Sequence, residues 1–217
     1  DYETLSWYQG NKIKKTLLIL PASPEIQKYM DFKEFIFEFT HIYIPDGFTR
    51  IGSHDDFSNA NWNANNKQID IYLPSSIKKI EHIQFCNGIN LYNFENTQLE
   101  TMEPYLFNTW DGTAITIPKS VKKIELDVFV SCTNLTTIIF QEDSQLENLS
   151  GQFIDYLTPV RELNIYCNGG LTIDGPFCNF TVKVINLNVP GTLFFNGGIL
   201  TGCNQLTEIK FNVNEII

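Results

Sequence analysis

The stretch Ile115-Thr-Ile-Pro-Lys-Ser-Val-Lys-Lys-Ile-Glu-Leu-Asp-Val-Phe-Val-Ser-Cys-Thr-Asn-Leu-Thr-Thr-Ile-Ile-Phe140 decides the fold, because it holds one complete unit of an internal repeat. Its first part has a near copy upstream: Pro74-Ser-Ser-Ile-Lys-Lys-Ile-Glu81 matches Pro118-Lys-Ser-Val-Lys-Lys-Ile-Glu125 at six of eight positions. The repeat continues in both directions with a period of about 23 residues. Such a period predicts a solenoid, in which each coil buries its apolar face against neighbouring coils.

Two apolar columns keep the same phase through the chain. The first lies at the end of each short apolar run, at Ile44, Leu73, Phe94, Ile117, Phe140, Ile165, Val189 and Phe211. The second is mainly aromatic, at Phe57, Phe85, Phe107, Phe129, Phe153, Phe177 and Leu200. We therefore expect a right-handed solenoid with one parallel β-sheet of about nine short strands. Turns and short helical or 3₁₀ segments should form the other side, because each unit is too short for a helix of typical length.

The expected strands follow the first column. They lie near residue 17 and at about 42–44, 69–73, 91–94, 114–117, 137–140, 162–165, 185–189 and 208–211. Proline comes directly after several of these runs, as at Pro45, Pro74 and Pro118, where it ends strand pairing without removing a needed donor.

A further set of residues lies three positions after the aromatic column, which we call the corner position. It is occupied by Trp110, Cys132, Tyr156, Phe180 and Cys203. We expect all five side chains to be buried. The chain has five cysteines without a C-x-x-C pair, so the thiols at this position are interpreted as small core residues, although a disulfide between neighbouring coils stays open.

The chain divides into a lead-in and one repeat domain. Residues 1–16 are expected to be a lead-in or the remnant of a preceding domain, and residues 17–217 form a repeat domain of period about 23. Residues 24–37 fit either a short capping helix or an ordinary first coil. The coil around 57–66 is stretched by an Asn-rich insertion, which is either a tolerated surface loop or a carrier of binding groups.

Composition excludes some classes of partner. The net charge of −10 argues against nucleic acid and against anionic membrane surfaces, since both need clustered Lys and Arg. No apolar run reaches the roughly 18 residues of a membrane span, and the N-terminus lacks the layout of a signal peptide. Because the sequence starts at Asp1, we expect a processed or trimmed piece of a longer protein.

The repeat resembles the BspA-type leucine-rich repeat. In the stretch quoted above, a strand ends in Ile-Pro and is followed by Ser-Val-x-x-Ile, an aromatic residue, a Cys three positions later and a Leu before the next strand. Ser144-Gln-Leu-Glu-Asn-Leu149 and Thr201-Gly-Cys-Asn-Gln-Leu-Thr-Glu-Ile-Lys-Phe211 are similar to it as well. The resemblance covers about residues 17–217 and implies a leucine-rich-repeat solenoid in a cell-surface or secreted protein. Members are often proposed to adhere to host proteins or to other cells.

No catalytic or metal-binding motif is evident. His41, His54 and His82 fall at different coil positions, so they predict no metal site, and no cofactor is expected. The sequence contains neither a Gly-x-Ser-x-Gly elbow nor a phosphate-binding loop. We therefore expect a protein that is not an enzyme.

The best candidate for a binding surface is the outward face of the strands. Alternation places one column of residues there, namely Tyr43, Tyr72, Asn93, Thr116, Ile139, Asn164, Asn188 and Lys210. Tyr43 and Tyr72 would be aromatic anchors beside Asn- and Thr-rich surface that suits a peptide or a glycan, and Trp62 in the insertion is a further candidate. The alternative is that β-propensity alone selected these residues.

The sequence thus favours a non-enzymatic, monomeric interaction or adhesion module that binds a host or neighbouring-cell protein or glycan. A parallel β-helix enzyme acting on polysaccharide shares stacked short strands, but it needs acidic and basic residues aligned on adjacent coils. A purely structural spacer in a larger surface protein is the third option.

Overall fold

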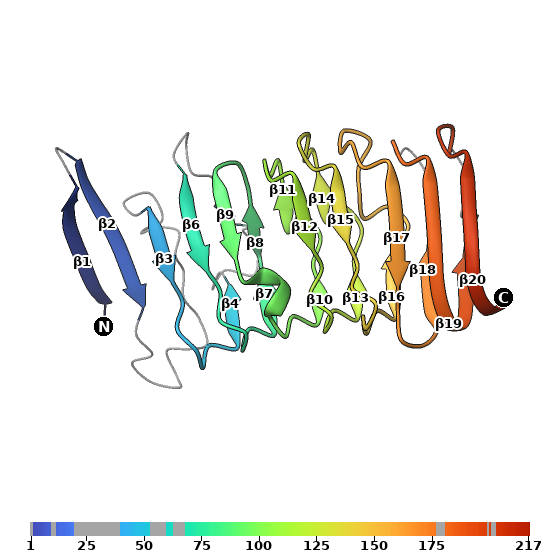
Figure 1. Ribbon diagram of the computed structural model, residues 1–217, viewed down its shortest axis with the longest axis horizontal. Coiled ribbons are helices and arrows are strands. Elements are labelled where there is room, and N and C mark those ends of the chain that lie inside the picture. The colour runs from blue at the N-terminus through green and yellow to red at the C-terminus, as the bar shows by residue number, and fades with distance from the viewer. Residues whose placement is uncertain are drawn as a thin grey trace.

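The structure, a computed structural model, is a β-solenoid of about six turns, and the residues that it describes contain almost no helix. It describes residues 2–9, 12–19, 40–52, 60–62, 68–176, 181–198, 200 and 203–217. Figure 1 shows the coils side by side along one long axis, with β1 (Tyr2–Gln9) at one end and β20 (Glu208–Ile216) at the other. The segment predicted as either a capping helix or a first coil, 24–37, lies outside the described residues.

One side of the solenoid, which we call the front side, carries the strands that the sequence predicts, close to their predicted positions. They are β2 (Lys12–Ile19), β3 (His41–Tyr43), β6 (Ile69–Tyr72), β9 (Ile89–Tyr92), β12 (Ala114–Thr116), β15 (Thr137–Ile139), β17 (Glu162–Tyr166), the first half of β19 (Val184–Asn196) and β20. Neighbours along this side pair in parallel, and β1 adds an antiparallel partner to β2. The single nine-stranded sheet is not confirmed, because the backbone ladder is interrupted between β9 and β12 and between β15 and β17.

The expected helical segments on the other sides of the coils are not confirmed, because most of the described residues there form short strands and turns. The second side carries β4 (Arg50–Gly52), β7 (Lys79–Glu81), β10 (Thr101–Met102), β13 (Lys123–Ile124), β16 (Asn148–Ser150), β18 (Leu171–Asp174) and the end of β19. The third side carries β5 (Ala60–Trp62), β8 (Ile83–Phe85), β11 (Phe107–Asn108) and β14 (Phe129–Val130). Among the described residues, one 3₁₀ turn is present, η3 (Phe94–Asn96).

Single residues with positive φ explain why helical turns are not needed. His82, Tyr105 and Asp127 have φ of 56°, 63° and 54°, and each comes shortly before a third-side strand. Thr109 and Ser131 have φ of 56° and 55° directly after such strands. Because one left-handed residue redirects the chain sharply, each corner uses fewer residues than a helical turn, and the remainder stays extended.

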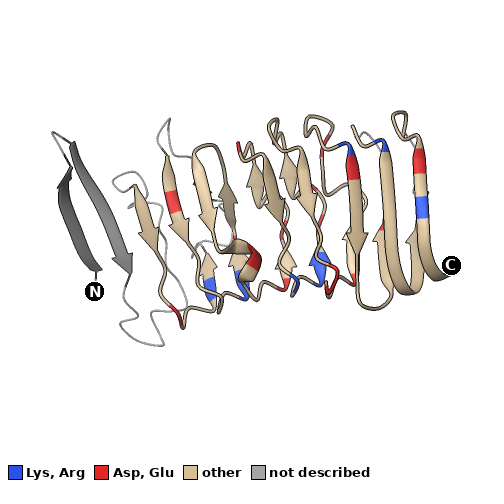
Figure 2. Ribbon diagram, viewed as in Figure 1, with Lys and Arg blue, Asp and Glu red and all other residues tan. Residues whose placement is uncertain are grey.

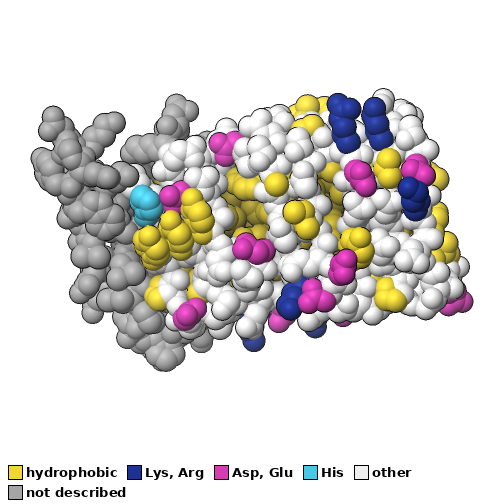
Figure 3. Space-filling view, viewed as in Figure 1, with side chains coloured by type: hydrophobic (Ala, Val, Ile, Leu, Met, Phe, Trp, Pro, Cys, Tyr) yellow, Lys and Arg dark blue, Asp and Glu magenta, His cyan; other side chains and the backbone are white. Residues whose placement is uncertain are grey.

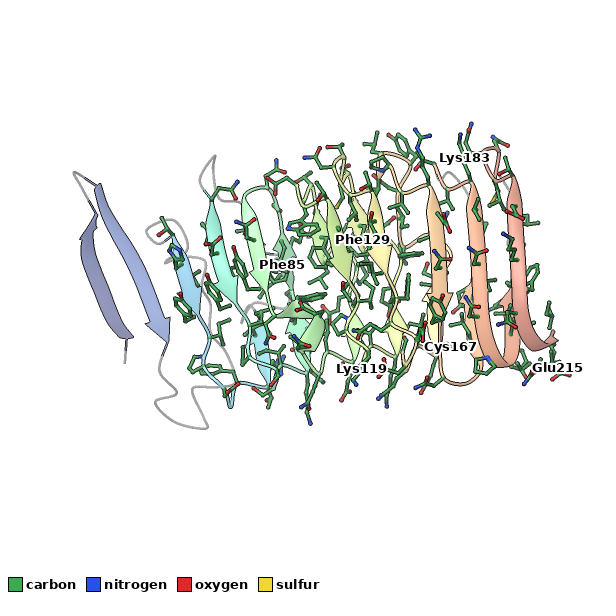
Figure 4. The ribbon with its side chains drawn as sticks, in the orientation of Figure 1. Phe85, Lys119, Phe129, Cys167, Lys183 and Glu215 are labelled. Carbon is green, nitrogen blue, oxygen red and sulfur yellow. The ribbon has the colours of Figure 1, made fainter. Side chains whose placement is uncertain are left out.

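The core is a continuous stack inside the coil. Phe85, Phe107, Phe129 and Phe153 of the predicted aromatic column are fully buried, and Figure 4 shows Phe85 and Phe129 inside the coil. The rings of Phe107 and Phe129 stack with centroids 5.1 Å apart. Each such side chain contributes about 1.5–3 kcal/mol through burial, so the column is a main source of stability.

The first interruption of the front side is closed by Trp110. Its indole Nε1–H donates to the carbonyl oxygen of Ile89 at 2.8 Å, on the edge of β9 that faces β12. The ring lies against Gly112, where an added Cβ would come within 2.1 Å of Trp110 Cη2. Trp110 thereby supplies the hydrogen bond that a neighbouring strand would otherwise give, and the ladder can open there without leaving that carbonyl unpaired.

The corner position is buried in the middle coils, but the prediction is wrong for Tyr156. Trp110 and Cys132 are buried, Cys203 is half-buried against the core, and Phe180 lies outside the described residues. Tyr156 is 66% exposed.

Thr158 replaces Tyr156 inside this coil. Its Oγ1 donates to the Phe129 carbonyl at 3.3 Å, just as Cys132 Sγ contacts the Phe107 carbonyl at 3.4 Å one coil earlier. Phe140 and Ile165 are 25 residues apart, which is longer than the usual period of about 23 residues. In this longer coil the buried position lies two residues further along the chain.

Candidate binding face

Three tyrosines form one row on the front side, which we call the tyrosine row. Tyr43, Tyr72 and Tyr92 are register partners on β3, β6 and β9. The ring centroids of Tyr43 and Tyr72 are 4.3 Å apart at 7°, and those of Tyr72 and Tyr92 are 4.6 Å apart at 11°. Tyr43 is 37% exposed, Tyr92 is 42% exposed and Tyr72 between them is half-buried. Figure 3 shows a run of hydrophobic side chains beside a histidine at this place.

Sequence reasoning found two of these tyrosines and missed the third. Asn93, which was predicted to point outward from the strand, follows the end of β9 at φ 67° and caps η3. Its Nδ2 donates to the Leu73 carbonyl at 2.8 Å. The prediction counted back from Phe94 as if it were a strand residue, whereas alternation from buried Ile89 places Asn90 and Tyr92 outward.

A polar row runs beside the tyrosine row. Asp70 accepts a hydrogen bond from Asn90 Nδ2 at 2.8 Å and lies 3.3 Å from His41 Nε2. Asn90 also donates to Gln68 Oε1 at 3.1 Å. These contacts fix the side chains that flank the tyrosines, so this part of the surface is rigid.

Stacking decides which part of each tyrosine a partner can reach. Because the rings lie face to face, both faces of Tyr72 are covered by its neighbours. Ring edges, which carry partial positive charge, and hydroxyl groups remain accessible. Desolvation raises the pKa of Tyr72, and a hydrogen bond with Tyr43 raises it further, so Tyr72 is uncharged at neutral pH. This arrangement suits contact with apolar and hydrogen-bond-accepting groups.

The other predicted face residues do not join this row. Thr116 pairs with the exposed Ile139 in the separate ladder of β12 and β15. Asn164 pairs with Asn186, whose Nδ2 donates to Asn164 Oδ1 at 2.7 Å. Glu162 accepts hydrogen bonds from both amides, at 3.2 Å and 3.3 Å.

Asn188 and Trp62 lie in yet other positions. Asn188 belongs to a column with Tyr166 and Asn212, one column away from Asn164. Trp62 is part of β5 and pairs with Phe85 on the third side, so part of the predicted insertion is strand. The Trp62 side chain lies outside what the structure describes.

A groove of about 500 Å³ marks the second interruption of the front side. It lies between β15 and β17, and its lining includes Ile138, Ile139, Arg161, Glu162, Asn164 and Tyr166. The sequence carries no evident signal for this groove, because the predicted strands on both sides of it have the same apolar alternation as strands that pair. Figure 2 shows that charged residues are sparse on the front strands and gather mostly along the lower edge of the solenoid.

The thiols and titratable groups form no evident reactive centre. Among the described residues, no three His, Cys, Asp or Glu side chains come together as a metal site. Cys132 and Cys167 are free, buried thiols. Burial raises the pKa of Cys132 to about 12 and also raises that of Cys167, so both thiols are protonated and unreactive at neutral pH.

Comparison with known proteins gives one family match and one solved structure. Residues 57–182 match the family model of the BspA type leucine rich repeat region in six copies. A leucine-rich repeat protein from Bacteroides ovatus ATCC 8483 aligns with 15% identity and a TM-score of 0.39, over 99% of this chain and 77% of that chain. No curated protein matches the chain.

None of the helices in the described part of the chain is long and apolar enough to cross a membrane. The pattern of strands, the buried columns and the six matched repeat copies lead to one assignment. The matched residues make up more than half of the sequence. The chain belongs to the BspA-type leucine-rich repeat family.

Proposed function

We propose that this chain is a non-enzymatic interaction module of a cell-surface or secreted protein, and that it binds a protein partner through its front side. The tyrosine row is the observation that carries the proposal. Tyr43, Tyr72 and Tyr92 lie on paired parallel strands, hold one another by stacking and expose their edges. Rigid aromatic side chains give large contact area at low entropic cost, which is typical of interface anchors.

Family membership supports the general function. Leucine-rich repeats are a protein-interaction fold, and BspA-type members are typically at the surface or secreted. A solenoid also presents a broad face on which adjacent coils contribute equivalent positions to one partner. We expect the chain to act as a monomer.

A protein partner is favoured over a glycan by the stacking itself. Sugars usually bind against an open aromatic face, and here the central ring has none available. The accessible hydroxyls and positive ring edges match the carbonyl oxygens and apolar side chains of a protein surface. Glycan binding is therefore the alternative outcome of the same experiment.

The experiment compares the chain with a triple variant, Tyr43→Ala, Tyr72→Ala and Tyr92→Ala. Both are tested on immobilised matrix proteins, on a glycan array and in a polysaccharide hydrolysis assay. We expect the wild-type chain to bind at least one matrix protein and the triple variant to bind it at least about 100-fold more weakly, since anchor residues dominate interface energy. Tyr156→Ala is the matched control, because it removes an exposed tyrosine outside the row.

Three results would contradict the proposal. Unaltered binding by the triple variant would place the site elsewhere. Binding to glycans alone would change the class of partner. Hydrolysis of a polysaccharide would show that the chain is an enzyme.

A further inference from the structure

The groove between β15 and β17 is a second candidate site, distinct from the tyrosine row. It opens because the two strands do not pair, although their coils remain paired on the second side through β16 and β18. The result is a wedge, closed at the back and open at the front. Its volume of about 500 Å³ falls within the range of small-ligand pockets.

The groove exposes a backbone edge. Thr137 N–H donates to the Thr113 carbonyl at 3.3 Å, and the Ile139 carbonyl accepts from Ile117 N–H at 2.9 Å, so both residues bond toward β12. Ile138 lies between them and therefore directs its N–H and C=O toward β17. No backbone hydrogen bond joins the described strands β15 and β17. The Ile138 carbonyl thus faces the groove as an acceptor that β17 does not satisfy.

At the first interruption, a side chain of the protein itself fills the gap between the strands. There the carbonyl that faces away from the paired strand belongs to Ile89, and the indole of Trp110 donates to it at 2.8 Å. The ring is 7% exposed, and the space left beside it is about 210 Å³. An amphipathic ring with one donor therefore satisfies both the hydrophobic wall and the backbone acceptor.

At the second interruption, none of the residues that the structure describes donates a ring N–H or O–H to the Ile138 carbonyl. In the coil that leads into β17, the residue that corresponds in sequence to Trp110 is Tyr156. Its side chain is exposed to solvent, and the smaller Thr158 is buried instead. The remaining space is more than twice that at the first interruption.

We propose that this groove receives an aromatic ring from outside: the Trp or Tyr side chain of a protein partner, with its N–H or O–H donating to the Ile138 carbonyl. Only the origin of the ring, a protein, rests on the function proposed above. Ile139 and Tyr166 provide apolar walls, and Arg161 at the rim can cover the ring face through a cation–π contact.

Other ligands fit the groove less well. An added peptide strand needs several consecutive backbone groups, whereas β15 turns only Ile138 of its three residues toward the groove. A phosphate or carboxylate ligand would meet the Glu162 carboxylate beside Arg161, so like charges would oppose binding. A neutral ring with one donor has neither difficulty.

The test is a titration of the ¹⁵N-labelled full chain with N-acetyl-L-tryptophanamide, followed by NMR. We expect shifts at the amides of Ile138, Ile139 and Asn164 with a dissociation constant on the order of 1 mM, as befits one side chain without its protein. N-acetyl-L-leucinamide should not shift them. The N1-methylated tryptophan analogue, which lacks the donor, should bind about fivefold more weakly.

Variants assign the site. Ile139→Glu should weaken N-acetyl-L-tryptophanamide binding at least about tenfold, because a carboxylate would replace the apolar wall. Leu126→Glu is the matched control, since Leu126 and Ile139 are 46% and 45% exposed, and it should bind as the wild type does. Circular dichroism spectra that match the wild type establish that both variants fold.

The proposal is overturned if the tryptophan probe leaves the groove amides unshifted, if the leucine probe shifts them equally, or if N1-methylation has no effect. It is also overturned if N-acetylglucosamine or galactose binds there more tightly than the tryptophan probe. The triple tyrosine variant should still bind the probe. Failure of this groove and failure of the tyrosine row are therefore separate results.

Discussion

The two interruptions of the front side have opposite outcomes. Between β9 and β12, the indole of Trp110 occupies the space and bonds the Ile89 carbonyl. Between β15 and β17, a groove remains and the Ile138 carbonyl faces it. The difference shows that a solenoid can open its ladder wherever a side chain, or a partner, takes over the hydrogen bond of the missing strand.

Coil length alone does not decide where the ladder opens. Tyr43 and Tyr72 are 29 residues apart and their strands pair, whereas Ile139 and Asn164 are 25 residues apart and their strands do not. The side chain at the corner before the strand also differs between coils, since Trp110 precedes β12, Cys132 precedes β15 and Thr158 precedes β17. Variants at these corners can therefore test what each side chain contributes to strand pairing.

The largest effect is expected for Trp110→Ala. This change empties a buried ring position and leaves the Ile89 carbonyl without its donor. The free energy of unfolding should fall by about 3–5 kcal/mol, as for other buried Trp side chains. Urea unfolding followed by circular dichroism measures it, with Tyr156→Ala as a control expected to cost less than about 0.5 kcal/mol. A loss below about 1 kcal/mol would show that Trp110 does not close the first interruption.

Gly112→Ala tests the packing of the Trp110 indole against Gly112. The new Cβ would lie 2.1 Å from Trp110 Cη2, so the ring must shift, at a cost of about 1–3 kcal/mol. Gly169→Ala is the control, since nothing lies within 4 Å of its added Cβ. In a Trp110→Ala background the cost of Gly112→Ala should largely disappear, and additive costs in this double-mutant cycle would contradict the contact.

Thr158→Val tests the corner before the open groove. It keeps the shape of the buried side chain but removes the hydroxyl, whose single hydrogen is shared between Asp155 Oδ1 at 2.8 Å and the Phe129 carbonyl at 3.3 Å. The expected loss in unfolding free energy is about 1–2 kcal/mol. Thr136→Val, at an exposed site, should cost less. Equal losses for the two variants would mean that Thr158 has no special role at this corner.

The smallest effect concerns Cys132, which holds the corner position between the two interruptions. Its pKa is about 12 in the folded chain because of burial, and near 8.5 in the unfolded chain. Since the unfolded chain loses the proton first, stability falls as pH rises above about 8.5. Between pH 7.5 and 9.5, under reducing conditions, the wild-type chain should lose about 1 kcal/mol more than Cys132→Ala. Identical pH profiles for the two chains would contradict the buried thiol.

The inward columns could be predicted because buried positions are occupied by apolar residues, which the sequence shows directly. Ile44, Leu73, Ile117 and Ile165 had to be apolar to pack against neighbouring coils, and all four are buried. Phe211 of the same column is exposed, because β20 is the outermost described strand and has a partner on one edge only. Apolar periodicity thus located the strands but not the sheet in which they pair.

The corners and the candidate sites were harder to predict from the sequence than the strands. His82, Tyr105 and Asp127 share a left-handed backbone conformation, yet no chemical property unites their side chains. Tyr92 was missed because the chain turns at Asn93, one residue before the apolar Phe94 that resembled a strand end. The groove was missed because it depends on two neighbouring strands that do not pair, and the apolar pattern of β15 and β17 is the same as that of strands that do pair.

A crystal structure of the chain soaked with N-acetyl-L-tryptophanamide would show whether the groove receives an aromatic ring. We expect an indole ring between β15 and β17, with its nitrogen about 3 Å from the Ile138 carbonyl oxygen, as the Trp110 nitrogen lies 2.8 Å from that of Ile89. Continuous backbone pairing of β15 with β17, with the Ile138 carbonyl bonded to β17 and no space between the strands, would contradict it.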